Sequence, residues 1–401
     1  MSIAQSLRWR IWRIFALAIA ATVSLSPTVA CRSISNTDSS RLYAYPGNPL
    51  FAAAAQLKAK GQHSEAAELE VIAETPSGIW AAGQPGEMQE IRQVTLVAAK
   101  AHSVPLIVAY NLPARDACGK FSASRGAASR YKKWINQLAA AIGTGDDIII
   151  VEPDGLPDIV RSCLSSAQSV QRYQLLRYAM KELGTLPHAQ VYLDAGNPGM
   201  FKDPSQLAEP LERAGVRYGR GFSANVSNFQ WTASVVTWSQ QLEHALSGEV
   251  GGVIDTSRNG RGPYTGRHTP QWCNPPGRAS GPTPRLHPGP DGIDAYLWIK
   301  DPGASDGSCN GGPPAGQYWP KYAAALERAS HYPLLSLPSA SVRPTDPAHS
   351  DHAGPQVSGG TRVLVPHVRT GPAPSPSPTS NARPAAKAVR SQVRTVAPTG
   401  P

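Results

Sequence analysis

The strongest constraint on the fold is a regular alternation of apolar, β-branched runs with amphipathic helical segments. Val104–Asn111 ("VPLIVAYN") and 147–154 ("DIIIVEPD") are rich in valine and isoleucine. Between them, 128–143 carries its large apolar side chains at helical spacing and ends in Gly143, a glycine suited to a helix C-cap. Strand, helix and strand repeated in this order predict an α/β fold with a parallel sheet that closes towards a barrel.

The same alternation continues along the chain. A helical segment, "SVQRYQLLRYAMKELGTL", precedes a strand-like run, "AQVYLDAG", and another helix is expected near Asp203 to Ala214. The remaining predicted elements are a strand in "RGFSANVSNF", a helix containing "WSQQLEHAL", and strands in "GGVIDTSRNG" and "DAYLWIKDPG". In such folds, functional residues collect where the strands reach their C-terminal ends.

Polar side chains follow the predicted strands at these ends. They are Arg115 and Asp116, Glu152 and Asp154, Asp194 and Asn197, Asp255, Arg258 and Asn259, and Lys300 and Asp306. A single acid after a strand is often a helix N-cap, but several acids that meet at one mouth favour a catalytic cleft. Like charges raise one another's pKa, so one carboxyl group keeps its proton at working pH, as glycoside hydrolysis requires.

The N-terminal segment differs in composition from the rest of the chain. Residues 1–30 combine three arginines with an apolar run and small residues before Ala30. This combination predicts a cleaved secretory signal peptide, and its apolar run is too short to span a membrane. Cys31 comes directly after it, as in lipoprotein signals, but Thr28 stands where those signals prefer leucine. Plain secretion and lipid anchoring through Cys31 therefore both stay open.

The C-terminal segment, 333–401, contains 13 prolines and no Phe, Trp, Tyr or Cys. We expect a disordered basic tail, because such a segment buries too little apolar surface to offset its ordering entropy. The net charge of +10 divides into +3 from the signal peptide, +5 from this tail and +2 from the rest. A nearly neutral central domain, predicted at 41–332, argues against nucleic-acid binding. We expect this domain to be a monomer.

Cysteine usage agrees with export. Besides Cys31, the chain has an even set, Cys118, Cys163, Cys273 and Cys309, which allows three pairings. We favour Cys118–Cys163 and Cys273–Cys309, because each bond would then join loops that follow strands. The sequence has no CxxC or HExxH spacing, so neither a metal nor another cofactor is expected.

Six motifs in one order carry a resemblance to a known family. They are "YNLPARDAC", "EPDGL", "YLDAG", "IDTSRNG", "WCNPPG", and "LWIK" followed by "DG". Together they resemble glycoside hydrolase family 6, the inverting cellulases that act on β-1,4-glucan, over about Asn48 to Ala329. The resemblance implies a distorted, incomplete β/α (TIM-like) barrel with the glucan lying across its C-terminal face.

The resemblance also implies roles for individual residues. Asp154 corresponds to the general acid that protonates the leaving glycosidic oxygen, and Asp116 to the acid that raises the donor's pKa and helps to organise the attacking water. Asp306 matches the candidate general base, in a family whose inverting members are argued to activate water indirectly. The implied substrate-binding residues are Tyr110, Arg115, Asp194, Trp272, Lys300 and Trp80. Trp80 and Trp298 are left open between a core position and a sugar-stacking position.

The sequence departs from the family pattern at four positions. Ala117 is inserted before Cys118, and Asn197, Met200 and Ala304 stand where the family commonly has histidine, tryptophan and glutamate. Met200 has no flat face for stacking a sugar ring, so one subsite should bind less tightly. None of these changes removes a predicted proton carrier.

The function that we predict is an endo-1,4-β-glucanase with an open cleft. Exo-acting relatives roof the cleft with long loops, but the segment from Trp272 to Lys300 is short and Gly307 to Trp319 is a glycine- and proline-rich turn. Two alternatives remain from other classes. One is a catalytically weak glucan-binding envelope protein that kept the fold, and the other is a structural or adhesive envelope protein with a basic tail.

Overall fold

The computed structural model describes residues 41–118 and 127–332. The predicted signal peptide, Cys31 and the predicted basic tail lie outside these residues. Within the described ranges, no helix is both long enough and apolar enough to cross a lipid bilayer.

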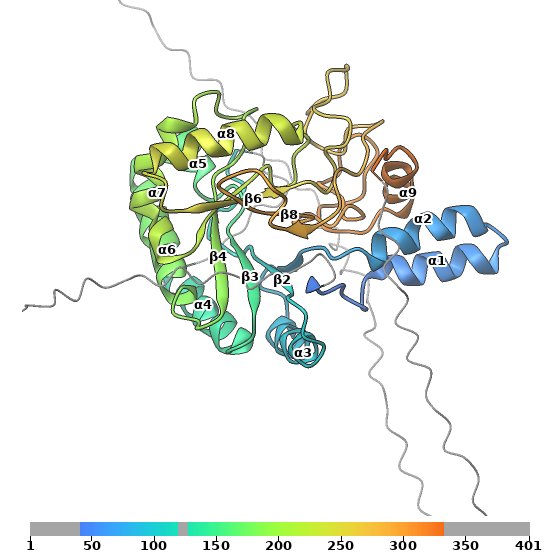
Figure 1. The fold of residues 1–401 in the computed structure, drawn as a ribbon, viewed down its shortest axis with the longest axis horizontal. Helices are drawn as coiled ribbons and strands as arrows, with labels where there is room; N and C mark the ends of the chain where they lie inside the picture. Colours follow the sequence, from blue (N-terminus) through green and yellow to red (C-terminus); the bar gives the residue numbers. More distant parts are fainter. Residues whose placement is uncertain (1–40, 119–126, 333–401) are drawn as a thin grey trace, which may run out of the picture. The chain divides into compact units, whose positions relative to one another are not determined.

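Eight strands of the described residues form one curled sheet in the order β1-β2-β3-β4-β5-β6-β8-β7 (Figure 1). All neighbouring pairs are parallel except β7 and β8, which are antiparallel. The strands are β1 (Ile79–Ala81), β2 (Leu106–Ala109), β3 (Asp147–Val151), β4 (Ala189–Asp194), β5 (Gly221–Ala224), β6 (Gly251–Asp255), β7 (Arg285–Leu286) and β8 (Ile293–Leu297). This half-barrel confirms the predicted fold class.

Helices cover the outer side of the sheet, where α4, α6 and α7 lie along one flank and α8 crosses near β6 (Figure 1). The helix α2 packs beside both α1 and α9. The helices are α1 (Pro49–Ala59), α2 (His63–Glu74), α3 (Glu87–Lys100), α4 (Ala128–Ile142), α5 (Pro157–Val160), α6 (Ser166–Leu183), α7 (Ala208–Ala214), α8 (Thr232–Ala245) and α9 (Pro320–Arg328), with two short 3₁₀ turns, η2 (Pro204–Leu207) and η3 (Val216–Tyr218).

The central strands are buried on both faces. Alternate residues point to opposite sides of a strand. Accordingly, Ile107 and Ile149 belong to the outer core under the helices, whereas Val108 and Ile150 belong to the core inside the curl of the sheet. Two-sided burial explains why these strands appear in the sequence as unbroken apolar runs.

The six strands expected from the sequence are all present. α4 ends at Ile142, and its C-cap is Gly143, whose φ of +73° is a conformation that glycine adopts readily. The expected helix near Asp203 to Ala214 is instead the 3₁₀ turn η2 followed by α7. The sequence analysis did not assign α1, α2, α3, α5, α9, β1 or β7. Most of these lie before the first or after the last predicted strand.

Both favoured disulfides are present. Cys118 is bonded to Cys163, with Cα atoms 5.3 Å apart, and Cys273 is bonded to Cys309, with Cα atoms 6.2 Å apart. The first bond links the loop after β2 to the segment after α5, and the second links the loop after β6 to the loop after β8. Each bond therefore fixes chain near the C-terminal ends of strands.

Candidate active site

A cleft of about 1040 Å³ lies at the C-terminal ends of the parallel strands. Segments that follow β1, β2, β3, β4, β5, β6 and β8 all contribute to its lining. The predicted site residues that line it are Trp80, Tyr110, Arg115, Asp116, Asp154, Trp272, Lys300 and Asp306. Asp194 is buried and is not among the lining residues.

The loop after β3 carries Asp154 in an unusual backbone conformation. Asp154 has φ of +65° and Glu152 has φ of +51°, a left-handed region that side chains other than glycine rarely adopt. Gly155 is needed for another reason, because a Cβ atom there would lie 2.8 Å from the carbonyl oxygen of Glu152. Strain of this kind persists only where neighbouring groups hold the backbone in place.

Two buried carboxylates hold this loop. The carboxylate of Glu152 accepts hydrogen bonds from the backbone N–H groups of Asn111 (3.1 Å) and Leu112 (3.0 Å), which tie it to the loop after β2. The Oδ2 atom of Asp194, at the end of β4, accepts a hydrogen bond of 2.9 Å from the backbone N–H of Asp154. The candidate proton donor is therefore fixed from both neighbouring strands.

The environment of Asp154 favours its protonated form. Burial raises the pKa of Asp154 well above its usual value, and the nearby carboxylates of Asp194, Asp158 and Asp116 raise it further. The guanidinium of Arg161 acts in the opposite direction but does not outweigh these effects. A carboxyl group that keeps its proton near neutral pH is suited to act as a general acid.

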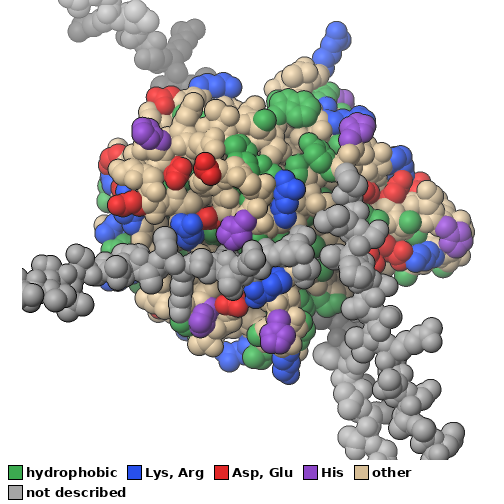
Figure 2. Space-filling model, in the orientation of Figure 1, with side chains coloured by type: hydrophobic (Ala, Val, Ile, Leu, Met, Phe, Trp, Pro, Cys, Tyr) green, Lys and Arg blue, Asp and Glu red, His purple; other side chains and the backbone are tan. Residues whose placement is uncertain are grey.

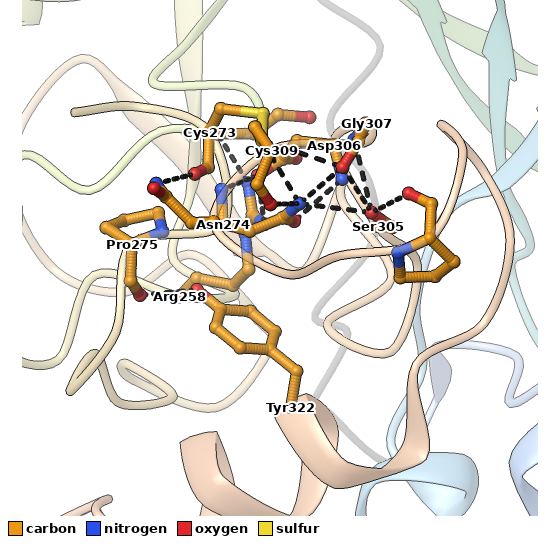
Figure 3. The surroundings of a disulfide bond; sticks show 12 residues. Arg258, Cys273, Asn274, Pro275, Ser305, Asp306, Gly307, Cys309 and Tyr322 are labelled. Carbon is orange, nitrogen blue, oxygen red and sulfur yellow. Dashed lines mark hydrogen bonds and ion pairs between the residues drawn. A yellow bond between two sulfur atoms is a disulfide. The ribbon is translucent and has the colours of Figure 1, made fainter. Parts of the chain in front are cut away.

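Asp306 also lines the cleft, in a loop that the Cys273–Cys309 bond joins to its neighbour (Figure 3). Its Oδ2 atom accepts hydrogen bonds of 2.9 Å from Arg258 Nη1 and from the backbone N–H of Asn274. The Oδ1 atom lies 3.5 Å from Lys300 Nζ. The Asn274 side chain in turn accepts a hydrogen bond of 2.9 Å from the backbone N–H of Asp306. Reciprocal hydrogen bonds therefore join the loop after β6, which carries Asn274, to the loop after β8, which carries Asp306.

These contacts keep Asp306 ionised. Burial raises its pKa, but the charges of Arg258 and Lys300 and the hydrogen bonds outweigh this effect, so that the pKa of Asp306 is lowered below its usual value. Asp154 and Asp306 thus have pKa values shifted in opposite directions within one cleft. Two carboxyl groups separated in this way can take different roles in acid–base chemistry.

Aromatic and cationic side chains also line the cleft. Trp80 and Tyr110 meet edge to face with ring centroids 5.1 Å apart, and Trp80 Nε1 donates a hydrogen bond of 2.9 Å to the carbonyl of Ile299. Lys300 Nζ lies 5.8 Å from the Trp80 ring, and Trp272 is 38% exposed. Trp298 is fully buried and packs with residues of α1, α2 and α9, so it is a core residue.

Other acids at strand ends connect loops and do not face the cleft. The carboxylate of Asp255, at the end of β6, accepts hydrogen bonds from the backbone N–H groups of Ser227 (2.8 Å) and Lys300 (3.0 Å), which follow β5 and β8. Like Glu152 and Asp194, it is almost completely buried and outside the lining. Of the six acids that the sequence pattern placed at strand ends, only Asp116, Asp154 and Asp306 therefore line the cleft.

The positions that depart from the family pattern lie at or beside the cleft. Asn197, Met200 and Ala304 all line it. The side chain of Asn197 accepts hydrogen bonds from the backbone N–H groups of Gly199 (2.9 Å) and Met200 (3.2 Å), so it stabilises its own turn. The backbone N–H of the inserted Ala117 donates a hydrogen bond of 2.7 Å to a carboxylate on α5.

The structure also places residues in the cleft that the sequence analysis missed. At one end, the hydroxyl of Tyr45 donates to Glu90 (2.6 Å), and the hydroxyl of Tyr318 donates to Asp301 (2.7 Å). These residues come from irregular segments or from the unassigned helix α3. Asp301 directly follows the predicted site residue Lys300, but no motif or periodic pattern marked the other three in the sequence.

One group of side chains has the spacing of a metal site. Ligand atoms of Cys118, Asp158 and Cys163 lie within 4.8 Å of one another. Both sulfur atoms are already joined in a disulfide, so neither is a thiolate available to a metal. The residues in this group therefore do not fit a metal ion while the disulfide is intact.

Charged side chains of both signs are interspersed on the face of the molecule shown in Figure 2. Lysine and arginine side chains on this face lie singly or in small groups between polar and apolar ones. Continuous basic stripes are the usual footprint of nucleic-acid binding. The view agrees with the nearly neutral charge of the central part of the sequence.

Comparisons with known proteins agree with one another. A family model for glycosyl hydrolases family 6 matches residues 37–330. Endoglucanase A of Cellulomonas fimi is 38% identical over 272 residues, covering 67% of this chain and 58% of that protein. Endoglucanase 1 of Streptomyces sp. (strain KSM-9) is 37% identical over 273 residues, covering 66% of this chain and 73% of that protein. This chain therefore spans less than two thirds of the Cellulomonas protein.

Solved structures give the same result. The endoglucanase Cel6 from Mycobacterium tuberculosis, in complex with methyl-cellobiosyl-4-deoxy-4-thio-β-D-cellobioside, superposes with a TM-score of 0.66 at 36% sequence identity. The superposition covers 72% of this chain and 96% of that one.

Proposed function

Because the chain belongs to glycosyl hydrolases family 6, we propose that it is an endo-1,4-β-glucanase that hydrolyses β-1,4-glucan with inversion, with Asp154 as the general acid. The observation that carries this proposal is the pair Asp154 and Asp306. They line one cleft from separate loops, and their pKa values are shifted in opposite directions. Inverting glycosidases need one protonated carboxylic acid and a separate carboxylate, with room for water between them.

In the proposed mechanism, the carboxylic acid of Asp154 transfers its proton to the glycosidic oxygen as the bond from that oxygen to the anomeric carbon breaks. Positive charge develops on the anomeric carbon and ring oxygen, and a water molecule attacks from the opposite face of the sugar. The water loses a proton during this attack, either to Asp306 or through a further water. Until it takes up a proton, the ionised Asp306 also stabilises the positive transition state through its charge.

Asp116 has a supporting role in this proposal. It lies in the cleft lining, almost buried, and its charge raises the pKa of Asp154. A negative charge beside the donor keeps the proton on Asp154 until the substrate oxygen accepts it. Asp194 acts through the backbone of Asp154, because it is buried beneath the loop and does not line the cleft.

Support for a glucan substrate comes from the relatives and from the lining of the cleft. The named relatives are endoglucanases, and the Mycobacterium endoglucanase was solved in complex with a cellobiose-based ligand. Trp80, Tyr110 and Trp272 offer aromatic surfaces suited to sugar rings, and Lys300 offers a donor for hydroxyl groups. Arg115, whose guanidinium lies 4.7 Å from the Tyr110 ring centroid, holds that ring in place.

The domain organisation is part of the proposal. Residues 41–332 form the catalytic domain, and the protein acts outside the cell as a monomer. The signal peptide expected at 1–30 and the basic tail expected at 333–401 lie outside the described residues and stay predictions. The two disulfides support an oxidising location. We propose secretion; Cys31 lies outside the described residues, so lipid anchoring there stays untested.

A catalytically weak glucan-binding protein is the second candidate. Met200 and Ala304 favour it, because each lines the cleft where a stronger sugar contact was expected. Release of reducing ends from a soluble β-1,4-glucan by the wild type, measured beside Asp154→Ala, separates the two functions. If the protein is a hydrolase, the wild type releases reducing ends and Asp154→Ala releases almost none. If it is a binding protein, both forms bind the glucan and neither releases reducing ends.

A further inference from the structure

Arg172 is a buried arginine on α6 that reaches two of the loops at the active site. It is 3% exposed, and its guanidinium donates hydrogen bonds to the carbonyl oxygens of Pro113 (3.1 Å) and Ala114 (2.6 Å) in the loop after β2. It also donates to the carbonyl oxygen of Gly155 (3.2 Å) in the loop after β3. One side chain thus joins the segment before Asp116 to the segment after Asp154.

Asp158 on the short helix α5 completes this arrangement. It is 1% exposed, and its Oδ2 atom lies 3.6 Å from Arg172 Nη1. The same carboxylate accepts hydrogen bonds from the backbone N–H groups of Ala117 (2.7 Å) and Cys118 (3.4 Å). Arg172 therefore binds the loop after β2 on one side of Asp116, and Asp158 binds it on the other side.

The geometry points to a function for this ion pair in the proposed hydrolysis: we propose that Asp158 and Arg172 form a positioning clamp that fixes Asp116 relative to Asp154. This inference rests on the proposed function, since the clamp positions Asp116 and Asp154, the two acids to which that function gives roles in hydrolysis. Neither clamp residue is given a proton-transfer role.

Two physical arguments favour positioning over simple stabilisation. A buried ion pair contributes little net stability, because the loss of hydration offsets the attraction, and apolar pairs often replace it without loss. The loops also need holding, because Ala114, Asp116 and Asp154 all have φ between +53° and +65°. A backbone in this region relaxes unless surrounding contacts prevent it.

Charged groups around Asp154 shift its pKa, and one of them, Asp158, belongs to the clamp. Asp194, Asp158 and Asp116 raise its pKa, and Arg161 lowers it. Replacing Asp158 by asparagine removes one negative charge, so Asp154 should lose its proton at lower pH. Replacing Arg172 by lysine keeps the positive charge but removes the planar group that reaches three carbonyl oxygens.

The experiment compares Arg172→Lys and Asp158→Asn with a matched control, Arg177→Lys. Arg177 is also on α6, but it bonds to Tyr218 and Glu212, away from the active-site loops. We expect Arg172→Lys to lower kcat on a soluble β-1,4-glucan by roughly 10²-fold with little change in KM, because small misplacement of reacting groups has effects of about that size. The control should keep its activity.

The pH dependence of kcat/KM separates positioning from stability, because a loss of stability alone does not shift it. We expect the high-pH limb of kcat/KM to shift to lower pH in Asp158→Asn and to stay in place in Arg172→Lys. The double variant Asp158→Asn/Arg172→Lys should lose less activity than the product of the two single losses, because residues that act as one unit have non-additive effects.

Amide hydrogen exchange tests the clamp independently of activity. Exchange should become faster in both 110–118 and 153–158 in Arg172→Lys, but in neither segment in Arg177→Lys. Unchanged exchange in these segments, or wild-type kcat per folded molecule in Arg172→Lys, would overturn the clamp. A wild type that releases no reducing ends but shows the expected exchange would overturn the proposed function and leave the clamp in place.

Discussion

The buried carboxylate of Asp194 accepts a hydrogen bond of 2.9 Å from the backbone N–H of Asp154. The contact joins the ends of the neighbouring strands β3 and β4 and helps to hold Asp154 in its left-handed conformation. The charge of Asp194 also raises the pKa of Asp154, so one side chain contributes both to the position and to the protonation of the proposed donor.

Asp154→Asn should reduce turnover by ~10²–10⁴-fold on glucans, whose leaving groups are poor, because general acid catalysis contributes about that much. An amide has the shape of the acid but no proton to transfer. Initial rates of reducing-end release from a soluble β-1,4-glucan measure the effect. Aryl glycosides with activated leaving groups should lose less activity, and an equal loss on both kinds of substrate would show that Asp154 is structural.

Hydrolysis should invert the anomeric centre. Asp154 and Asp306 are carried by loops after β3 and β8, and inverting enzymes keep their two carboxyl groups about 6.5–9.5 Å apart so that water fits between them. Proton NMR of the first sugars released from a β-glucan, recorded before mutarotation, identifies the product. The account predicts the α-anomer, and an initial β-anomer would require a covalent intermediate.

The loop that carries Asp306 should depend on the Cys273–Cys309 bond. The double variant Cys273→Ser/Cys309→Ser should lower the free energy of unfolding by about 2–4 kcal/mol, the usual effect of losing a disulfide. Its activity should also fall, because Asn274, next to Cys273, holds Asp306 through two hydrogen bonds. Denaturant unfolding and glucan hydrolysis measure the two effects.

Peptide mapping of the unreduced wild type is the control for this variant. It should recover the peptides of Cys273 and Cys309 joined together, as the structure has them. Free thiols at these two positions would contradict the assignment, whatever the variant's stability.

Much of the sheet could be predicted from the sequence, because buried strands leave unbroken apolar runs and the helices between them keep their spacing. The position of individual acids was harder to predict. Asp194 and Asp255 are the last residues of β4 and β6, and each accepts hydrogen bonds from the backbone of loops after neighbouring strands. Asp154 instead lies three residues beyond β3. Which acid turns inward depends on the register between strands, and the sequence alone does not give it.

Tertiary partners explain the other differences. Trp298 is a core residue because it packs against α1, α2 and α9, and none of these helices was assigned from the sequence. The contact between Asp158 and Ala117 joins residues 41 positions apart. Neither relationship leaves a local pattern that periodicity or a motif would detect.

Asp147 should make stability depend on pH. Burial, followed by the charge of Asp146, raises the pKa of Asp147 to about 7, and neither carboxylate oxygen has a hydrogen-bond partner among the described residues. An unfolded chain has a pKa of about 3.9 at an aspartate, so the folded state binds more protons between these values. The free energy of unfolding should therefore fall as pH rises from about 4 to about 7.

Asp147→Asn removes this charge and should make the decline in stability with pH shallower. Relative to the wild type, the variant should gain stability between about pH 4 and pH 8 by at most ~4 kcal/mol, the amount that the shift in pKa represents. Denaturant unfolding at both pH values measures the gain. Asp291→Asn, at an exposed position in the turn before β8, is the control. Equal slopes for wild type and Asp147→Asn would contradict the assignment.

The central claim is that the cleft cuts glucan chains internally, and the most direct test follows the viscosity of carboxymethylcellulose against the reducing ends released. Trp272 lines the cleft and is 38% exposed, so a chain should enter from the side. The account predicts a steep fall in viscosity while few reducing ends have formed. Viscosity that barely falls while cellobiose accumulates as the main early product would contradict it.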